Sequence, residues 1–138
     1  MQSVWDESLA TGNEFIDRQH REVAHLIDML RASHLSTPEA GFRALEDLMA
    51  FVVTHFIAEE HLMRQVGYPE ASMNEMVRDH AWFTDHARLR VLEFRMGNEA
   101  NLLTLAAHLH DWLAVHEFGT DRLLADWIRA QETIRGET

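Results

Sequence analysis

The longest helical pattern in the chain runs from 38 to 66, and it limits the fold more than any other feature. Ser36-Thr37 offers an N-cap, Pro38 suits the first helical position, and Gly67 suits a C-cap. Only two prolines and six glycines occur in 138 residues, which favours long helices over many short strands. Apolar residues recur every three or four positions, as on one face of a helix, at Leu45, Leu48, Val52, Leu62 and Val66.

His55 and Glu59 lie on that same apolar face. A separation of four residues advances only about 40° around a helix, so an imidazole and a carboxylate both point toward the core. A buried carboxylate is costly unless it is paired, so Glu59 needs either a cationic partner or a metal. Glu60 and His61 fall off this face and are expected in solvent. A helix-stabilising His–Glu pair remains the alternative unless other helices bring similar chemistry.

Composition limits the class of protein. A length of 138 residues suits one domain over 1–138, and 46% hydrophobic content is enough for a core. The net charge of −11 argues against a nucleic acid or an anionic membrane as a partner. The absence of cysteine excludes thiolate metal sites and disulfides. With no signal-like N-terminus and no span-length apolar run, we expect a cytoplasmic protein.

The remaining chain has the same helical character. Short links between long amphipathic segments predict an all-α, up-down antiparallel four-helix bundle with an N-terminal arm and a short C-terminal helix. Asp17 is the expected N-cap of the first helix, and Gly119-Thr120 is expected to interrupt the last one. The expected elements are an extended arm over 1–16, helices over 17–34, 38–66, 70–95 and 99–118, and a tail helix over 121–133.

Each of the four helices directs a histidine inward. Buried polar groups need partners, and one shared metal centre would supply a partner to all of them. The set exceeds a tetrahedral zinc site, whereas two octahedral ions bridged by both carboxylates would use every member. The residues are His20, His55, His80 and His116, with the carboxylates of Glu59 and Asp121.

At this point the chain resembles a bacterial hemerythrin domain. The resemblance covers almost the whole sequence and rests on Trp5, Thr11-Gly12, the Ile16-Asp17-x-Gln19-His20 run, His55-Phe56-x-x-Glu59-Glu60-x-x-Met63, Gly67-Tyr68-Pro69, His80-x-x-Phe83, and Trp112-Leu113-x-x-His116 with Asp121. It implies a non-heme pair of iron ions (Fe2+/Fe3+) with an oxo or hydroxo bridge, which binds O2 or small anions. By the same resemblance, His20 and His55 serve the oxygen-binding iron, His80 and His116 serve the other iron, and Glu59 and Asp121 bridge. The oxygen pocket is lined by Phe56, Trp112, Leu113 and Glu117.

Two positions depart from the family pattern. Met76 stands four residues before His80, where the family carries another histidine, so one of seven protein ligands appears absent. A thioether matches ferric iron poorly, which favours a core role for Met76. Glu117 replaces an apolar pocket residue; it is a candidate ligand, a candidate proton donor, or a residue turned to solvent.

The leading hypothesis is therefore O2 or redox sensing rather than bulk O2 storage, with the first and last helices relaying the change. A covalently linked signalling output domain is one expected partner. Two alternatives stay open: a di-iron enzyme acting on peroxide or O2, and a metal-free bundle used for protein interaction.

Overall fold

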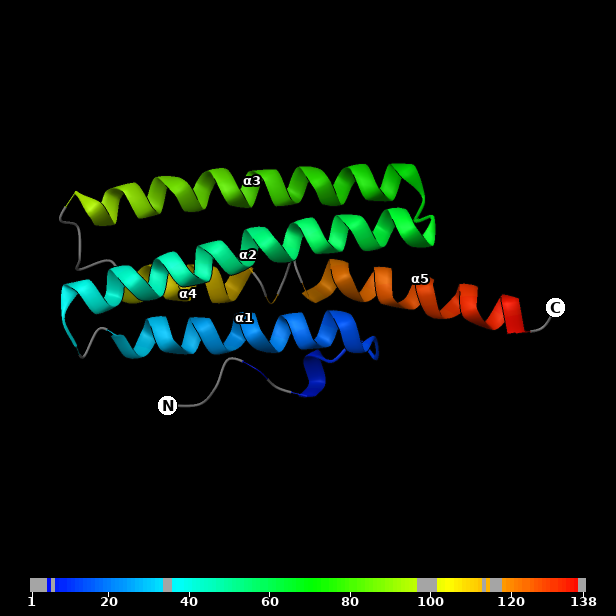
Figure 1. The fold of residues 1–138 in the computed structure, drawn as a ribbon, viewed down its shortest axis with the longest axis horizontal. Helices are drawn as coiled ribbons and strands as arrows, with labels where there is room; N and C mark the ends of the chain where they lie inside the picture. Colours follow the sequence, from blue (N-terminus) through cyan, green and yellow to red (C-terminus); the bar gives the residue numbers. More distant parts are fainter. Residues whose placement is uncertain are drawn as a thin grey trace.

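The chain folds as an antiparallel helical bundle. The computed structural model describes residues 5, 7–33, 36–96, 102–112, 114 and 118–136, and these ranges contain helices but no strand. Helices α1, α2 and α3 alternate in direction, and α4 and α5 follow one another as the fourth rod of the bundle (Figure 1). This arrangement confirms the predicted all-α, up-down fold. In chain order the elements are η1 (Glu7–Leu9), α1 (Glu14–Ala32), α2 (Pro38–Val66), α3 (Glu70–Arg95), α4 (Leu102–Trp112) and α5 (Phe118–Gly136).

The bounds of α2 and α3 agree with those predicted from local signals. Thr37 caps α2, because its hydroxyl accepts a hydrogen bond from the amide of Ala40 at 3.2 Å. Gly67 ends α2 with a φ of 69°, a left-handed conformation that glycine adopts without steric cost. These signals lie next to each other in sequence and do not depend on the rest of the fold.

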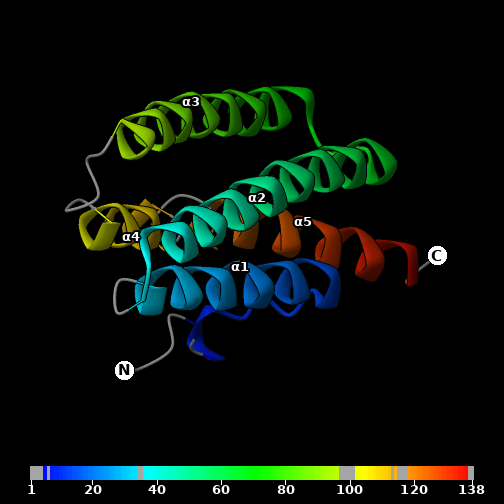
Figure 2. The ribbon, with the colours of Figure 1, turned by 60° about the vertical axis from the view of Figure 1, so that its left-hand side comes forward.

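The start of α1 differs from the prediction. Asn13, not Asp17, is the N-cap, and its side chain accepts a hydrogen bond from the amide of Ile16 at 3.1 Å. Asp17 lies one turn further on, where it is buried and bonded to the preceding segment. The N-terminal arm is also not wholly extended, since it contains the 3-10 helix η1. Figure 2 shows this arm along α1, on the side of the bundle away from α3.

The last helices also differ from the prediction. Helix α4 is described over Leu102–Trp112, and the ends predicted at 99 and just before 118 involve residues outside the described ranges; α5 runs from Phe118 to Gly136 rather than over 121–133. Gly119 and Thr120 therefore belong to the first turn of α5 and do not interrupt a helix. Asp121 lies in that first turn, where the amide dipoles of a helix N-terminus favour a negative charge.

The longest helix also exposes charge along its outer side. Helix α2 has 29 residues, and it presents Arg43, Glu46 and Asp47 to solvent. Across the described part of the chain, none of the helices combines the length and the apolar character needed to cross a membrane.

The core consists of two apolar clusters, one toward each end of the bundle. The larger cluster includes Val23, Val52 and Phe83, and the smaller includes Ile16 and Met63. On α1 and α3 a buried histidine falls between the two clusters in sequence, His20 and His80, and on α2 Glu59 does so, one turn after the buried His55. The fold therefore holds a polar layer inside an apolar core.

Candidate metal centre

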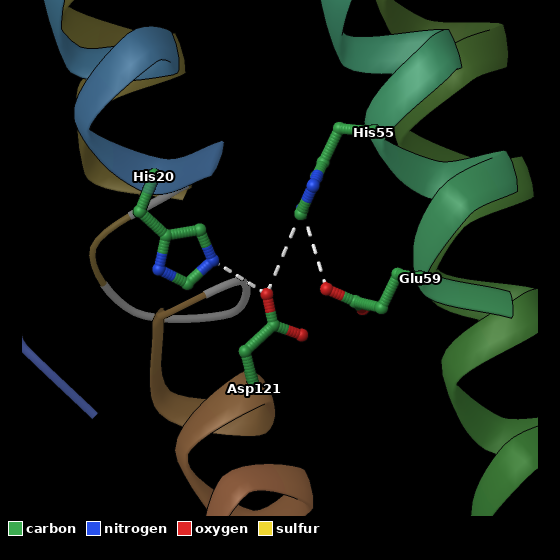
Figure 3. A group of neighbouring side chains, drawn as sticks. All are labelled: His20, His55, Glu59 and Asp121. Atoms are coloured by element: carbon green, nitrogen blue, oxygen red, sulfur yellow. Dashed lines mark hydrogen bonds and ion pairs between the residues drawn. The ribbon is translucent and has the colours of Figure 1, made fainter. Parts of the chain in front are cut away.

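Four buried side chains from three helices converge in this polar layer (Figure 3). His20 comes from α1, His55 and Glu59 from α2, and Asp121 from α5, and one potential ligand atom of each lies within 4.8 Å of the others. None of the four side chains is more than 1% exposed. They converge because each lies on the core-facing side of its helix, together with residues of the apolar clusters.

The distances between these donor atoms are short. The Nε2 of His20 lies 2.6 Å from Oδ2 of Asp121. The Nε2 of His55 lies 3.3 Å from Oε2 of Glu59 and 3.7 Å from Oδ2 of Asp121. The Asp121 carboxylate therefore stands between the imidazoles of α1 and α2, although it comes from α5.

His80 of α3 extends the cluster on the other side of Glu59. Its Nε2 lies 3.2 Å from Oε1 of Glu59, whereas His55 faces the other oxygen of the same carboxylate. The His80 ring stacks on Phe56, with centroids 3.9 Å apart and planes 8° from parallel. Glu59 thus presents one oxygen to an imidazole of α2 and one to an imidazole of α3.

Gln19 fixes the orientation of the His55 ring. The Nδ1 of His55 lies 3.1 Å from Oε1 of Gln19, so an N–H at Nδ1 donates to that amide oxygen. In the neutral ring this leaves Nε2 unprotonated, with its lone pair directed toward Glu59 and Asp121, whereas the protonated ring presents an N–H to these carboxylates. A second hydrogen bond of this kind commonly sets the tautomer of a metal-binding histidine.

The donor set fits a metal better than a set of paired side chains. Both Glu59 oxygens are buried, and neither has a hydrogen bond of acceptable geometry, although each lies within 3.3 Å of an imidazole nitrogen. A six-coordinate ion with bonds of about 2.1 Å holds adjacent donors roughly 3.0 Å apart, which is close to these separations. Imidazole and carboxylate together suit first-row metals such as iron.

The electrostatic environment keeps Glu59 ionised. Burial acts to raise the pKa of this carboxyl, but the facing imidazoles of His55 and His80 outweigh burial and hold the pKa below its ordinary value. Glu59 is therefore available as an anionic ligand at neutral pH.

The N-terminal segment links the two helices that carry His20 and Asp121. The carboxylate of Asp17 accepts hydrogen bonds from the amide and hydroxyl of Thr11, both at 2.8 Å, and from the amide of Gly12 at 3.1 Å. From α5, Nη2 of Arg129 donates to the carbonyl of Thr11 at 2.6 Å. Gly12 has a φ of 89°, and a Cβ there would collide with Arg129. The Thr11-Gly12 turn therefore holds α1 against α5.

Comparison with known proteins identifies the domain. The family model for the hemerythrin HHE cation binding domain matches residues 11–128. This chain belongs to the hemerythrin family. It is 29% identical over 128 residues to a bacteriohemerythrin of Stenotrophomonas maltophilia, which covers 92% of this chain and 82% of that protein. A bacteriohemerythrin of Pseudomonas paraeruginosa is 27% identical over 127 residues, covering 91% of this chain and 81% of that protein.

A solved structure supports the fold independently. The crystal structure of a hemerythrin mutant superposes with a TM-score of 0.81, covering 93% of this chain and 96% of that chain at 21% identity. The buried histidine, glutamate and aspartate cluster of this hemerythrin-family chain therefore occurs in a hemerythrin bundle, within a domain whose family is described as cation binding.

Most of the predicted site residues can be located in the structure. His20, His55, His80, Glu59 and Asp121 lie together in the polar layer, as described above. The predicted residues His116, Glu117 and Leu113 lie outside the described residues.

The two described members of the predicted oxygen pocket are neighbours. The rings of Phe56 and Trp112 are 6.0 Å apart and steeply inclined, at 70°. Phe56 in turn covers one face of His80. Glu60, expected in solvent, is half-buried, with an oxygen 3.9 Å from Nδ1 of His80.

Two residues position the site through contacts that the sequence alone does not indicate. In the sequence, Gln19 stands out only as part of a family motif, and Asp17 is the expected cap of α1. The signal for both was their place beside His20 in the Ile16-Asp17-x-Gln19-His20 run. Their partners, His55 and Thr11, are brought close by the packing of α2 and the N-terminal arm.

Proposed function

We propose that this hemerythrin-family domain holds two iron ions and binds O2 at them, and that it serves O2 or redox sensing rather than bulk storage. The observation that carries the proposal is the Glu59 carboxylate, which is fully buried with one oxygen facing His55 and the other facing His80. A carboxylate with a separate imidazole at each oxygen is suited to bridge two metal ions.

The proposed ligand set follows from these contacts and from the family pattern. In this proposal His20 and His55 would hold one iron, His80 and His116 would hold the other, and Glu59 and Asp121 would serve both. The iron pair, with an oxo or hydroxo bridge, supplies the redox chemistry and the position where O2 or a small anion binds. Gln19 keeps His55 in the tautomer that binds metal, and Phe56 fixes the plane of His80.

The environment of Met76 supports a site with fewer protein ligands than the family pattern. Met76 is 2% exposed and packs with Ile16, Met63 and Leu124 in the smaller apolar cluster. A thioether in such a cluster fills space and is a poor ligand for ferric iron. A more open centre is less suited to long-term O2 storage.

The Thr11-Gly12 turn supports a relay through the first and last helices. His20 on α1 and Asp121 on α5 lie 2.6 Å apart, and the turn joins the same two helices through Asp17 and Arg129. A change in the charge or geometry of the centre therefore acts on both helices at once. A linked output domain is the proposed receiver of that movement.

The test is reconstitution with ferrous iron without air, followed by admission of O2. Optical spectra recorded before O2, after O2, and after flushing with argon measure whether O2 binds and whether it is released. Hydrogen exchange measured in the same states reports on α1 and α5. We expect an O2-dependent spectrum together with altered exchange in both helices.

Two results would argue against parts of the proposal. An O2-dependent spectrum with unchanged exchange throughout α1 and α5 would contradict the relay and favour a storage protein. No spectral response to O2 in iron-loaded protein would contradict O2 binding itself.

A further inference from the structure

A pocket opens between α3 and α4, and it contains none of the buried histidines and carboxylates of the proposed metal centre. Its volume is about 200 Å³. The two helices that form it are neighbours at the end of the bundle where α3 ends (Figure 2). None of its lining residues belongs to the proposed metal ligands. The side chains that define its chemistry are Trp82, Phe83, His86, Arg90, His108 and Trp112.

Aromatic rings form the floor and one wall of this α3–α4 pocket. At the floor, Phe83 and Trp112 stack with centroids 3.9 Å apart and planes 25° from parallel. At the wall, Trp82 lies against His86, with centroids 4.0 Å apart. Trp82 is 54% exposed, so a large ring face is held at the surface by a neighbouring imidazole. Such surfaces bind flat rings by offset or edge contact.

The polar groups around the rings favour an anion. Arg90, His86 and His108 contribute a guanidinium and two imidazoles, and no acidic residue lines the pocket within the part of the chain that the structure describes. This contrasts with a net charge of −11 for the whole chain. Arg90 pairs with Glu93 at 3.0 Å, but both side chains are about half exposed. Exposed ion pairs of this kind are weak, so a bound anion can compete with Glu93.

We propose that the α3–α4 pocket binds a small aromatic carboxylate of a single ring. The ring would lie against Trp82 and the Phe83–Trp112 stack, and the carboxylate would accept hydrogen bonds from Arg90 and the imidazoles. The volume is below that of pockets for drug-sized ligands, which limits the occupant to about one ring and its acid group. The occupant would touch none of the proposed metal ligands, although Trp112 is shared with the proposed oxygen pocket.

Benzoate is the probe, and the full-length, iron-loaded protein is the sample. Calorimetry measures affinity, and the indole N–H signals of the tryptophans report the location by NMR. We expect a dissociation constant on the order of 1 mM, a shift of the Trp82 signal, and no change in the optical spectrum of the iron. Acetate lacks the ring and benzyl alcohol lacks the charge, so each should bind much more weakly than benzoate.

Matched variants on α3 separate the pocket from general electrostatics. Arg90→Gln and Trp82→Ala should each weaken benzoate binding about fivefold. Arg88→Gln removes the same charge two residues away, outside this pocket, and should leave the affinity unchanged. All three residues are exposed, so folding should persist.

Three outcomes would overturn the proposal. The first is absence of benzoate binding at a benzoate concentration ten times the expected dissociation constant. The second is equal weakening by Arg88→Gln and Arg90→Gln. The third is binding that acetate matches and that changes the iron spectrum, which would locate the anion at the buried centre instead.

Discussion

Replacing Asp17 by asparagine should destabilise the protein, because it removes one hydrogen bond and one negative charge. The carboxylate accepts three bonds, at 2.8, 2.8 and 3.1 Å, from Thr11 and Gly12. The oxygen of an asparagine can keep the two bonds to Thr11, but its NH2 group would face the amide of Gly12, donor against donor. Hydrogen bonds to charged groups contribute about 1.5–3 kcal/mol each, so we expect a loss of about 2 kcal/mol. For a chain of this size that lowers Tm by roughly 6 °C.

The same substitution should also change how stability depends on pH. Burial acts to raise the pKa of Asp17, but the hydrogen bonds from Thr11 and Gly12 outweigh it and hold the pKa below the ordinary value of 3.8. A carboxyl with a lowered folded pKa stabilises fully above its unfolded pKa, and loses that contribution as the pH falls through the folded value. The difference between wild type and Asp17→Asn should therefore be full at neutral pH and shrink in acid.

Urea denaturation across a pH series measures both the loss of stability and its pH dependence. Glu14→Gln is the matched control, because Glu14 lies in the same turn of α1 but is exposed, with only an exposed partner in Arg21. It should change stability by less than about 0.5 kcal/mol. The reasoning would be refuted if Asp17→Asn and wild type had the same unfolding free energy at neutral pH. It would also be refuted if the difference in unfolding free energy were as large in acid as at neutral pH.

Three further predictions concern the turn, the core and the metal. Gly12→Ala should cost at least about 1 kcal/mol, measured by denaturation, because φ is 89° and the new Cβ meets Arg129; wild-type stability would contradict this. Met76→Leu should change stability by less than about 1.5 kcal/mol and leave iron content unchanged, whereas loss of iron would mean that the thioether is a ligand. Removing metal with a chelator should lower the unfolding free energy by about 2.7 kcal/mol, relative to protein in a free metal concentration 100 times the metal dissociation constant. An unchanged Tm would support a metal-free bundle.

The sequence was most informative where the signals were local. Thr37, Pro38 and Gly67 determine the ends of α2 through contacts within one turn, so both bounds were predictable. The inward histidines were predictable for a similar reason, since helical periodicity alone fixes which face His20 and His55 occupy.

Features that depend on packing between segments were harder to predict. Asn13 and Asp17 are both good N-caps, and the choice between them is decided by Thr11 and Gly12, which engage the Asp17 carboxylate. The role of Gln19 requires knowing how close α1 lies to α2.

The predicted interruption at Gly119-Thr120 is wrong, because a glycine near a helix boundary does not show on which side of it the helix lies. Gly119 instead lies within the first turn of α5. Its flexibility does not by itself distinguish the start of a helix from its end. The inward direction of Asp121 was nevertheless anticipated, since the carboxylate reaches His20 across the bundle.

The most direct test of the account is the iron content of wild type and Glu59→Gln, each reconstituted with ferrous iron without air. Glutamine is nearly the same size but carries no charge, so the bundle should stay folded while the proposed bridge is weakened. The account predicts about two irons per wild-type chain and a clear loss in the variant, with helical content retained by circular dichroism. Fewer than one iron in wild type, or equal iron in both proteins, would contradict the central claim that Glu59 bridges a pair of metal ions.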